Sequence, residues 1–142
     1  MRRPFHPAFS ALSSNITGTG STLNCLYVAP SDPNTIYVSW DDNLMKTNDM
    51  GNTWTTVAVT GTAAITSIMV HPYNRDVLWI TRGGYTGGMK VYHSVNGGTS
   101  WTSMSSGLPN VPVNTLAFET GSNGAVYIGT EAGVYYRDSL TN

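Results

Sequence analysis

The chain has few charged residues, one cysteine and no long hydrophobic run. Of its 142 residues only 11% are charged, against about 25% in ordinary globular proteins, and the net charge is -1. Seven scattered lysines and arginines form no basic patch, which argues against nucleic acid as a partner. No apolar run approaches the ~20 residues of a membrane span, so no membrane partner is expected. The single Cys25 excludes an internal disulfide.

The N-terminal stretch MRRPFHPAFSALSS (1–14) has two arginines but no uninterrupted apolar segment, so it makes a poor signal peptide. The chain as written therefore predicts a cytoplasmic protein, or an extracellular one if it belongs to a larger secreted protein. The three histidines, His6, His71 and His93, lack the spacing of metal ligands. Neither a metal nor a cofactor is expected from these patterns.

Glycine, small polar residues and strand-favouring residues are abundant. Fifteen glycines accompany eight tyrosines and four tryptophans, a mixture typical of short strands joined by tight turns. A length of 142 residues suits one domain with a substantial core. We therefore predict an all-β protein.

Three segments of the sequence resemble one another, and each predicts a β-hairpin followed by a short third strand. Each hairpin has an alternating apolar run, a turn rich in Pro, Asn, Asp or Gly, and a second alternating run. The hairpin starts lie 42 and 48 residues apart. The hairpins are LYVAPSDPNTIYVSW (26–40), IMVHPYNRDVLWITR (68–82) and LAFETGSNGAVYIGT (116–130), with third strands at 43–47, 89–94 and 133–138.

A tryptophan opens a fourth strand in the first two repeats, at 53–59 and 100–104. Four antiparallel strands in about 40–50 residues are typical of β-propeller blades. The third repeat lacks this strand, but AFSALSSN (8–15) aligns with the tryptophan segments and places Phe9 at the position of Trp54 and Trp101. We predict one three-blade unit over 1–142: blade 1 at about 21–60, blade 2 at about 63–108, and blade 3 at about 110–142, completed by a strand at 8–14.

Three blades are too few for a closed ring, because propellers have about four to eight. Two apolar blade faces would then stay in water, and exposed faces of that kind usually mark association surfaces. Two copies would make a six-bladed ring with twofold symmetry, in which each N-terminal strand finishes the third blade of its partner. We therefore expect a homodimer. The alternative is a fragment of a larger propeller protein.

Two turns carry a recognisable motif. TNDMGNTW (47–54) matches the Asp-box pattern Ser/Thr-x-Asp-x-Gly-x-Thr-Trp, and SVNGGTSW (94–101) matches it with Asn96 for Asp and Ser100 for Thr. Together with YIGTEAGVYYRD (127–138), they make the sequence resemble the Asp-box, or BNR-repeat, propellers. That family includes sialidases, xyloglucanase-type glycoside hydrolases, sortilin-type receptors and a photosystem assembly factor. The resemblance implies the fold and leaves activity open, because the box occurs in proteins with unrelated tasks.

The box residues are interpreted as structural. A short Asp accepts hydrogen bonds from the backbone of its own turn, and Gly permits the positive φ that the turn requires. Asn96 can keep such a turn but cannot act as a carboxylate, so we predict that Asp49 stabilises a turn and is neither catalytic nor a metal ligand. The third repeat departs from the motif. The predicted structural set is Thr47, Asp49, Gly51, Trp54, Ser94, Asn96, Gly98 and Trp101.

A ligand is expected on the opposite end of the blades, called here the box-free face. In a propeller, the loops between second and third strands share that face with the linkers between blades, and the resemblance implies that it usually carries the site. An aromatic ring can stack on sugar C–H groups while carboxylates and an arginine bind hydroxyls. The alternative is that these are solvated loop residues. The candidates are Trp40, Asp41, Asp42, Arg82, Tyr85 and Glu131.

Catalysis has weaker support than binding. Glycosidases use two carboxyl groups about 5 to 9.5 Å apart, and Asp41 or Asp42 with Glu131 are the only candidates on this face. The arginine triad of sialidases is incomplete, and the xyloglucanase branch needs more blades and a second propeller. We therefore predict a non-catalytic, self-associating module with a glycan as its ligand. A glycoside hydrolase acting through Asp41, Asp42 and Glu131 is the alternative.

Overall fold

A computed structural model describes residues 4–5, 7–12, 16 and 21–138. Within these residues the chain forms strands and turns and no helix, so no helix is present there that could cross a membrane. The all-β prediction is confirmed. The strands are β1 (Cys25–Val28), β2 (Ile36–Trp40), β3 (Asn43–Thr47), β4 (Thr55–Val57), β5 (Ile65–His71), β6 (Asn74–Arg82), β7 (Val91–Ser94), β8 (Thr102–Ser103), β9 (Val113–Phe118), β10 (Val126–Thr130) and β11 (Gly133–Arg137).

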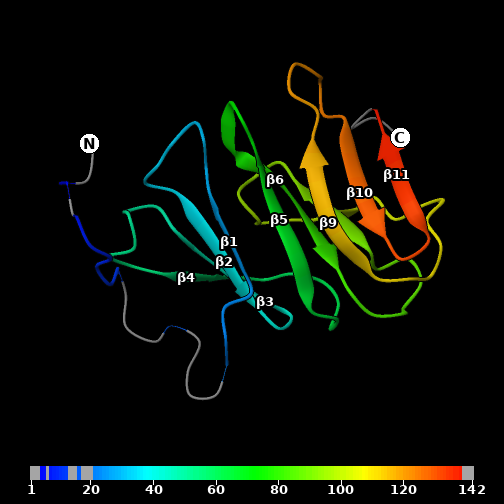
Figure 1. The fold of residues 1–142 in the computed structure, drawn as a ribbon, viewed down its shortest axis with the longest axis horizontal. Helices are drawn as coiled ribbons and strands as arrows, with labels where there is room; N and C mark the ends of the chain where they lie inside the picture. The colour runs from blue at the N-terminus through cyan, green and yellow to red at the C-terminus, as the bar shows by residue number, and fades with distance from the viewer. Residues whose placement is uncertain (1–3, 6, 13–15, 17–20, 139–142) are drawn as a thin grey trace.

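These strands form three antiparallel sheets that lie side by side (Figure 1). The strand orders are β1-β2-β3-β4, β5-β6-β7-β8 and β9-β10-β11, so each sheet is an up-and-down meander as the repeats predict. The first strands of successive sheets contact each other, β1 with β5 and β5 with β9. This arrangement places the first strands innermost and the last strands at the rim, as in propeller blades. The sheets are called blades 1, 2 and 3 below.

The predicted hairpins are present with the expected pairing. In blade 1, Leu26 lies opposite Val38, and the Ala29 amide donates to the Thr35 carbonyl to close the turn. In blade 2, Ile68 lies opposite Ile80. Blade 2 has apolar residues on both faces of its sheet, because it packs against blade 1 on one side and blade 3 on the other.

Two apolar layers hold the blades together. One layer lies between blades 1 and 2 and includes Leu44 and Tyr37 from blade 1 with Val70 and Leu78 from blade 2. The other lies between blades 2 and 3 and is built around Trp79, which is fully buried. Each buried aliphatic or aromatic side chain contributes about 1.5–3 kcal/mol relative to exposure, so the faces between blades are the main source of stability.

The rim strands and the N-terminal segment differ from the sequence-based expectation. The fourth strands β4 and β8 are short, because Trp54 and Trp101 precede the paired residues. Residues 8–12 of the predicted completing strand form no strand, and 13–14 lie outside the described residues. A Cβ placed on Gly51 would lie 3.3 Å from Leu12 Cβ, so this segment lies against blade 1. In the described residues of one chain, the third sheet therefore has three strands.

Candidate functional site

The turn after β3 is organised by the Asp49 carboxylate. Its Oδ1 accepts hydrogen bonds from Thr47 Oγ1 at 2.7 Å and from the Thr53 amide at 2.8 Å, and its Oδ2 accepts one from Thr53 Oγ1 at 2.6 Å. The Gly51 amide donates to Thr47 Oγ1 at 2.9 Å. The bonds from Thr53, and then that from Thr47, lower the pKa of Asp49 to about 2. Both carboxylate oxygens are thus engaged within their own turn.

The turn after β7 repeats this pattern with an amide. Asn96 Oδ1 accepts from Ser94 Oγ at 3.0 Å and from the Ser100 amide at 2.9 Å, and the Gly98 amide donates to Ser94 Oγ at 2.9 Å. The Asn96 amide group also donates to Ser100 Oγ at 2.9 Å. An amide oxygen therefore serves the same bonds as a carboxylate here, so this turn requires an acceptor and no negative charge.

These two turns lie at one end of the blades, called the box face, and they connect neighbouring blades. Lys46 Nζ of β3 donates to the Gly97 carbonyl at 2.8 Å, and the Trp101 indole donates to the Ala58 carbonyl at 2.9 Å. A shallow hollow of about 500 Å³ on this face is lined by hairpin-turn residues that include Tyr73 and Arg75. Arg75 forms an ion pair with Asp32 at 2.5 Å.

The opposite, box-free face is held together by backbone bonds between its loops. The Ile65 amide at the start of β5 donates to the Asp41 carbonyl at 2.7 Å, and the Gly83 amide donates to the Ala64 carbonyl at 2.9 Å. Asp41 has a φ of 47°, a region that Asp tolerates better than most residues. Asp42 accepts a 3.2 Å bond from the Asn43 side chain, and Trp40 at the end of β2 is half-buried.

Arg82 is buried beneath this face. Its exposed fraction is 0%, its NH1 group donates to the Ala63 carbonyl, and its guanidinium lies 6.0 Å from the centre of the Tyr92 ring. Burial lowers its pKa, while Tyr92 and Asp42 act in the opposite sense. A ligand on the surface would therefore reach Arg82 only if the linker at 61–64 moved.

Tyr85 and Glu131 meet across blades 2 and 3. The exposed Tyr85 hydroxyl donates to Glu131 Oε2 at 3.1 Å, joining the β6–β7 loop to the β10–β11 turn. This bond raises the pKa of Tyr85. Of the six candidate ligand residues, these two have side chains directly hydrogen-bonded to each other.

The sequence did not single out Lys90, which lies beside Arg82. It is 1% exposed and its ammonium donates to the Gly84 carbonyl at 2.6 Å, so burial lowers its pKa. The sequence predicts a strand at 89–94 that includes Lys90, but the burial of Lys90 depends on how the preceding glycine-rich loop folds back over the sheet. Among the described residues, no group of three or more His, Cys, Asp or Glu side chains could hold a metal ion.

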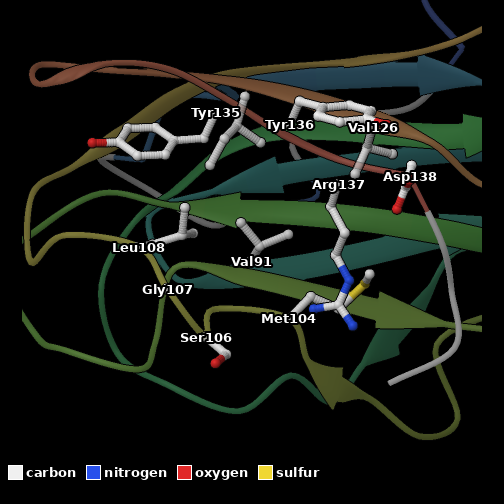
Figure 2. Close-up of a pocket in the computed structure, with 11 residues that line it drawn as sticks. Val91, Met104, Ser106, Gly107, Leu108, Val126, Tyr135, Tyr136, Arg137 and Asp138 are labelled. Atoms are coloured by element: carbon white, nitrogen blue, oxygen red, sulfur yellow. The ribbon is translucent and has the colours of Figure 1, made fainter.

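A cavity of about 680 Å³ lies at the rim between blades 2 and 3 (Figure 2). Val91 of β7 and Met104 after β8 line it from blade 2, while Val126 and Tyr135 line it from blade 3. Figure 2 shows the Arg137 side chain reaching from β11 towards Met104. No sequence pattern predicts this cavity, because the repeats indicate strands but not the space between them.

Comparison with known proteins gives one curated relative and several solved structures of similar fold. No family model matches the chain. Among curated proteins it resembles a xyloglucanase from Hypocrea jecorina (strain QM6a), with 29% identity over 124 residues, which are 84% of this chain and 15% of that protein. The chain thus covers well under two thirds of the length of that xyloglucanase.

Solved structures with a similar arrangement of blades include GH74 enzymes and YCF48. An ancestral GH74 enzyme superposes with a TM-score of 0.66 at 24% identity, over 82% of this chain and 17% of that one. The GH74 enzyme of Niastella koreensis gives 0.64 at 22% identity, over 82% and 21%. YCF48 from Cyanidioschyzon merolae gives 0.57 at 21% identity, over 84% and 37%. These likenesses show the fold: the three sheets are β-propeller blades.

Proposed function

We propose that this chain is a carbohydrate-binding propeller module whose box-free face binds a polysaccharide. The observation that carries the proposal is the 3.1 Å bond between Tyr85 and Glu131, which holds an exposed aromatic ring and a carboxylate together across two blades. An aromatic face packs against the C–H groups of a sugar, and a fixed carboxylate accepts bonds from its hydroxyls.

The neighbouring residues support the same chemistry. Trp40 ends β2 with its ring half-buried, and Asp42 follows it in the next turn, so blade 1 adds a second aromatic and acidic pair to this face. Because the curated relative is named a xyloglucanase, oligosaccharides of xyloglucan are the first ligands to test.

Calorimetric titration with a xyloglucan oligosaccharide tests the proposal. We expect Tyr85→Ala to weaken binding at least fivefold, about 1 kcal/mol, through loss of both the ring and the bond that orients Glu131. Tyr73→Ala is the matched control, since Tyr73 is also exposed but lies on the box face. Equal effects of the two substitutions, or no binding by the unaltered protein, would overturn the proposal.

A glycoside hydrolase is the second candidate, supported by the same relative and by the carboxyl groups of Asp41, Asp42 and Glu131. Glu131 is held by Tyr85, whereas Asp42 is bonded to Asn43. Release of reducing ends from xyloglucan would favour this candidate, provided that Glu131→Gln abolishes release while binding persists. Binding without release would favour the module.

We also propose that the module associates with a second copy. The first and last blades have outward faces with exposed apolar side chains, Leu26 and Val28 on β1, and Val134 and Tyr136 on β11. Exposed apolar faces of this kind are typical of association surfaces. Light scattering should give twice the 15.3 kDa mass of the chain. A stable monomer at micromolar concentration would instead favour a fragment of a longer propeller protein.

A further inference from the structure

We propose that the cavity between blades 2 and 3, with the outer edge of β11, is the docking site for residues 8–12 of a second copy. The donated segment forms the fourth strand of blade 3. The inference rests on the proposed self-association and is independent of glycan binding.

Blades 1 and 2 show how such a site is filled. The Trp101 indole, at the start of the fourth strand of blade 2, donates to Ala58 of blade 1, and Gly98 in the preceding turn packs on Val57. Val57 ends the fourth strand of blade 1 and Ala58 follows it, so the start of the rim strand of blade 2 packs on the end of the rim strand of blade 1.

Within the described residues of one chain, the same site on blade 3 holds no fourth strand. By the repeat spacing, Met104 and Ser105 correspond to Val57 and Ala58, and Phe9 corresponds to Trp101. Met104 lines the cavity, whereas Phe9 is fully exposed. A cavity lined mainly by apolar residues, with the Arg137 side chain at Met104, thus lies where an aromatic ring packs in the preceding blade. The aromatic residue aligned with that ring is exposed.

The outer edge of β11 can pair with a further strand in the register seen in blades 1 and 2. In the described residues β11 pairs with β10 alone, so its outer edge can accept a further strand. The residue after each rim tryptophan pairs with the third strand: Thr55 with Lys46, and Thr102 with His93. Tyr136 holds the equivalent place in β11, so Ser10 would lie opposite Tyr136.

The connectivity of the chain identifies a second copy as the donor. Segments 58–64 and 104–112 carry the chain from one rim strand to the innermost strand of the next blade. Gly51 of blade 1 lies against Leu12 as Gly98 of blade 2 lies against Val57, so residues 8–12 take the place of the rim strand in the blade that precedes blade 1. Blade 3 of the same chain lies at the opposite end of the row of blades (Figure 1), so in a closed pair the preceding blade is the partner's blade 3.

Disulfide trapping between two singly altered chains tests the pairing. In a Cys25→Ser background, chains with Ser10→Cys are mixed with chains carrying Tyr136→Cys, since directly opposed residues have Cβ atoms about 4.5–5.5 Å apart. We expect a covalent dimer on oxidation. Tyr127→Cys on the adjacent β10 is the matched control, because it is exposed and lies one strand further from the edge.

A second experiment measures assembly without any introduced cysteine. Phe9→Asp should raise the dissociation constant of the dimer at least tenfold, while Phe5→Asp, at a residue that is also exposed but lies outside the donated segment, leaves it unchanged. A dimer that ignores Phe9→Asp and forms no Ser10–Tyr136 disulfide would overturn strand donation while self-association survives. A monomer, or a disulfide formed within one doubly altered chain, would overturn the second copy as occupant.

Discussion

At the scale of single residues, the two box turns show that an acceptor oxygen, not a charge, maintains the turn. Asp49 and Asn96 accept equivalent bonds. We therefore expect Asp49→Ala to lower the melting temperature by a few degrees and Asp49→Asn to lower it less. Thermal unfolding monitored by circular dichroism would measure both. Equal losses for Ala and Asn would contradict the acceptor argument.

The charge of Asp49 has its own consequence for acid stability. The folded-state pKa of about 2 lies below the ordinary value of 3.8, so the bonded carboxylate stabilises the fold above pH 3.8. That contribution is lost as pH falls through about 2. Between pH 4 and 2, the unaltered protein should lose more stability than Asp49→Asn, a difference that denaturant titrations at the two pH values would detect.

The burial of His93 predicts a second pH dependence of folding stability, in a separate pH range. It is 8% exposed, its ring lies 4.9 Å from the ring of Trp79, and its Nε2 has no hydrogen-bond partner among the residues that the structure describes. Burial, and then the charge of Arg137, lower its pKa from 6.5 to about 4. Below pH 6.5 the unfolded chain binds a proton that the folded chain does not, so stability falls as pH falls from 6.5 towards 4.

Between pH 7.5 and 5 this should cost on the order of 2 kcal/mol in the free energy of unfolding. His93→Phe keeps an aromatic ring against Trp79 and removes the titrating group, so its stability should change less over the same interval. Urea titrations at the two pH values compare the variants. Identical pH slopes in both proteins would refute the assignment to His93.

At the scale of elements, the close approach of neighbouring rim strands depends on Gly98. Its φ is 88°, and a Cβ there would overlap Val57 Cγ1 of blade 1. Gly98→Ala should therefore cost about 2–4 kcal/mol, from backbone strain and overlap together. Gly121→Ala isolates the strain, because Gly121 has a φ of 89° and open space around it, and it should cost about 1–2 kcal/mol. Chemical denaturation would measure the two; equal costs would show that the blade contact matters little.

The sequence predicts the hairpins better than it predicts the rim strands or the loops. The hairpins follow from alternation and turn residues, and the strand at 43–47 matches β3 throughout its length. The rim strands are shorter than predicted, because each tryptophan bonds outside the ladder before pairing begins: Trp54 to Gly51 of its own turn and Trp101 to Ala58 of blade 1. The burial of Arg82 and Lys90 and the rim cavity depend on the packing of loops and blades distant in sequence, which no local pattern encodes.

At the scale of the whole molecule, the row of blades has two outward faces with exposed apolar side chains, one on blade 1 and one on blade 3. We expect a further blade to cover each of them. If a second copy covers both, joining two copies head to tail in one chain should give a monomeric six-bladed ring. Separate chains should show a melting temperature that rises with concentration, because dissociation accompanies unfolding. The tandem fusion should melt at a higher temperature that is independent of concentration. Scanning calorimetry over a hundredfold range of concentration distinguishes the two, and a tandem fusion that itself dimerises would show that six blades do not close the ring.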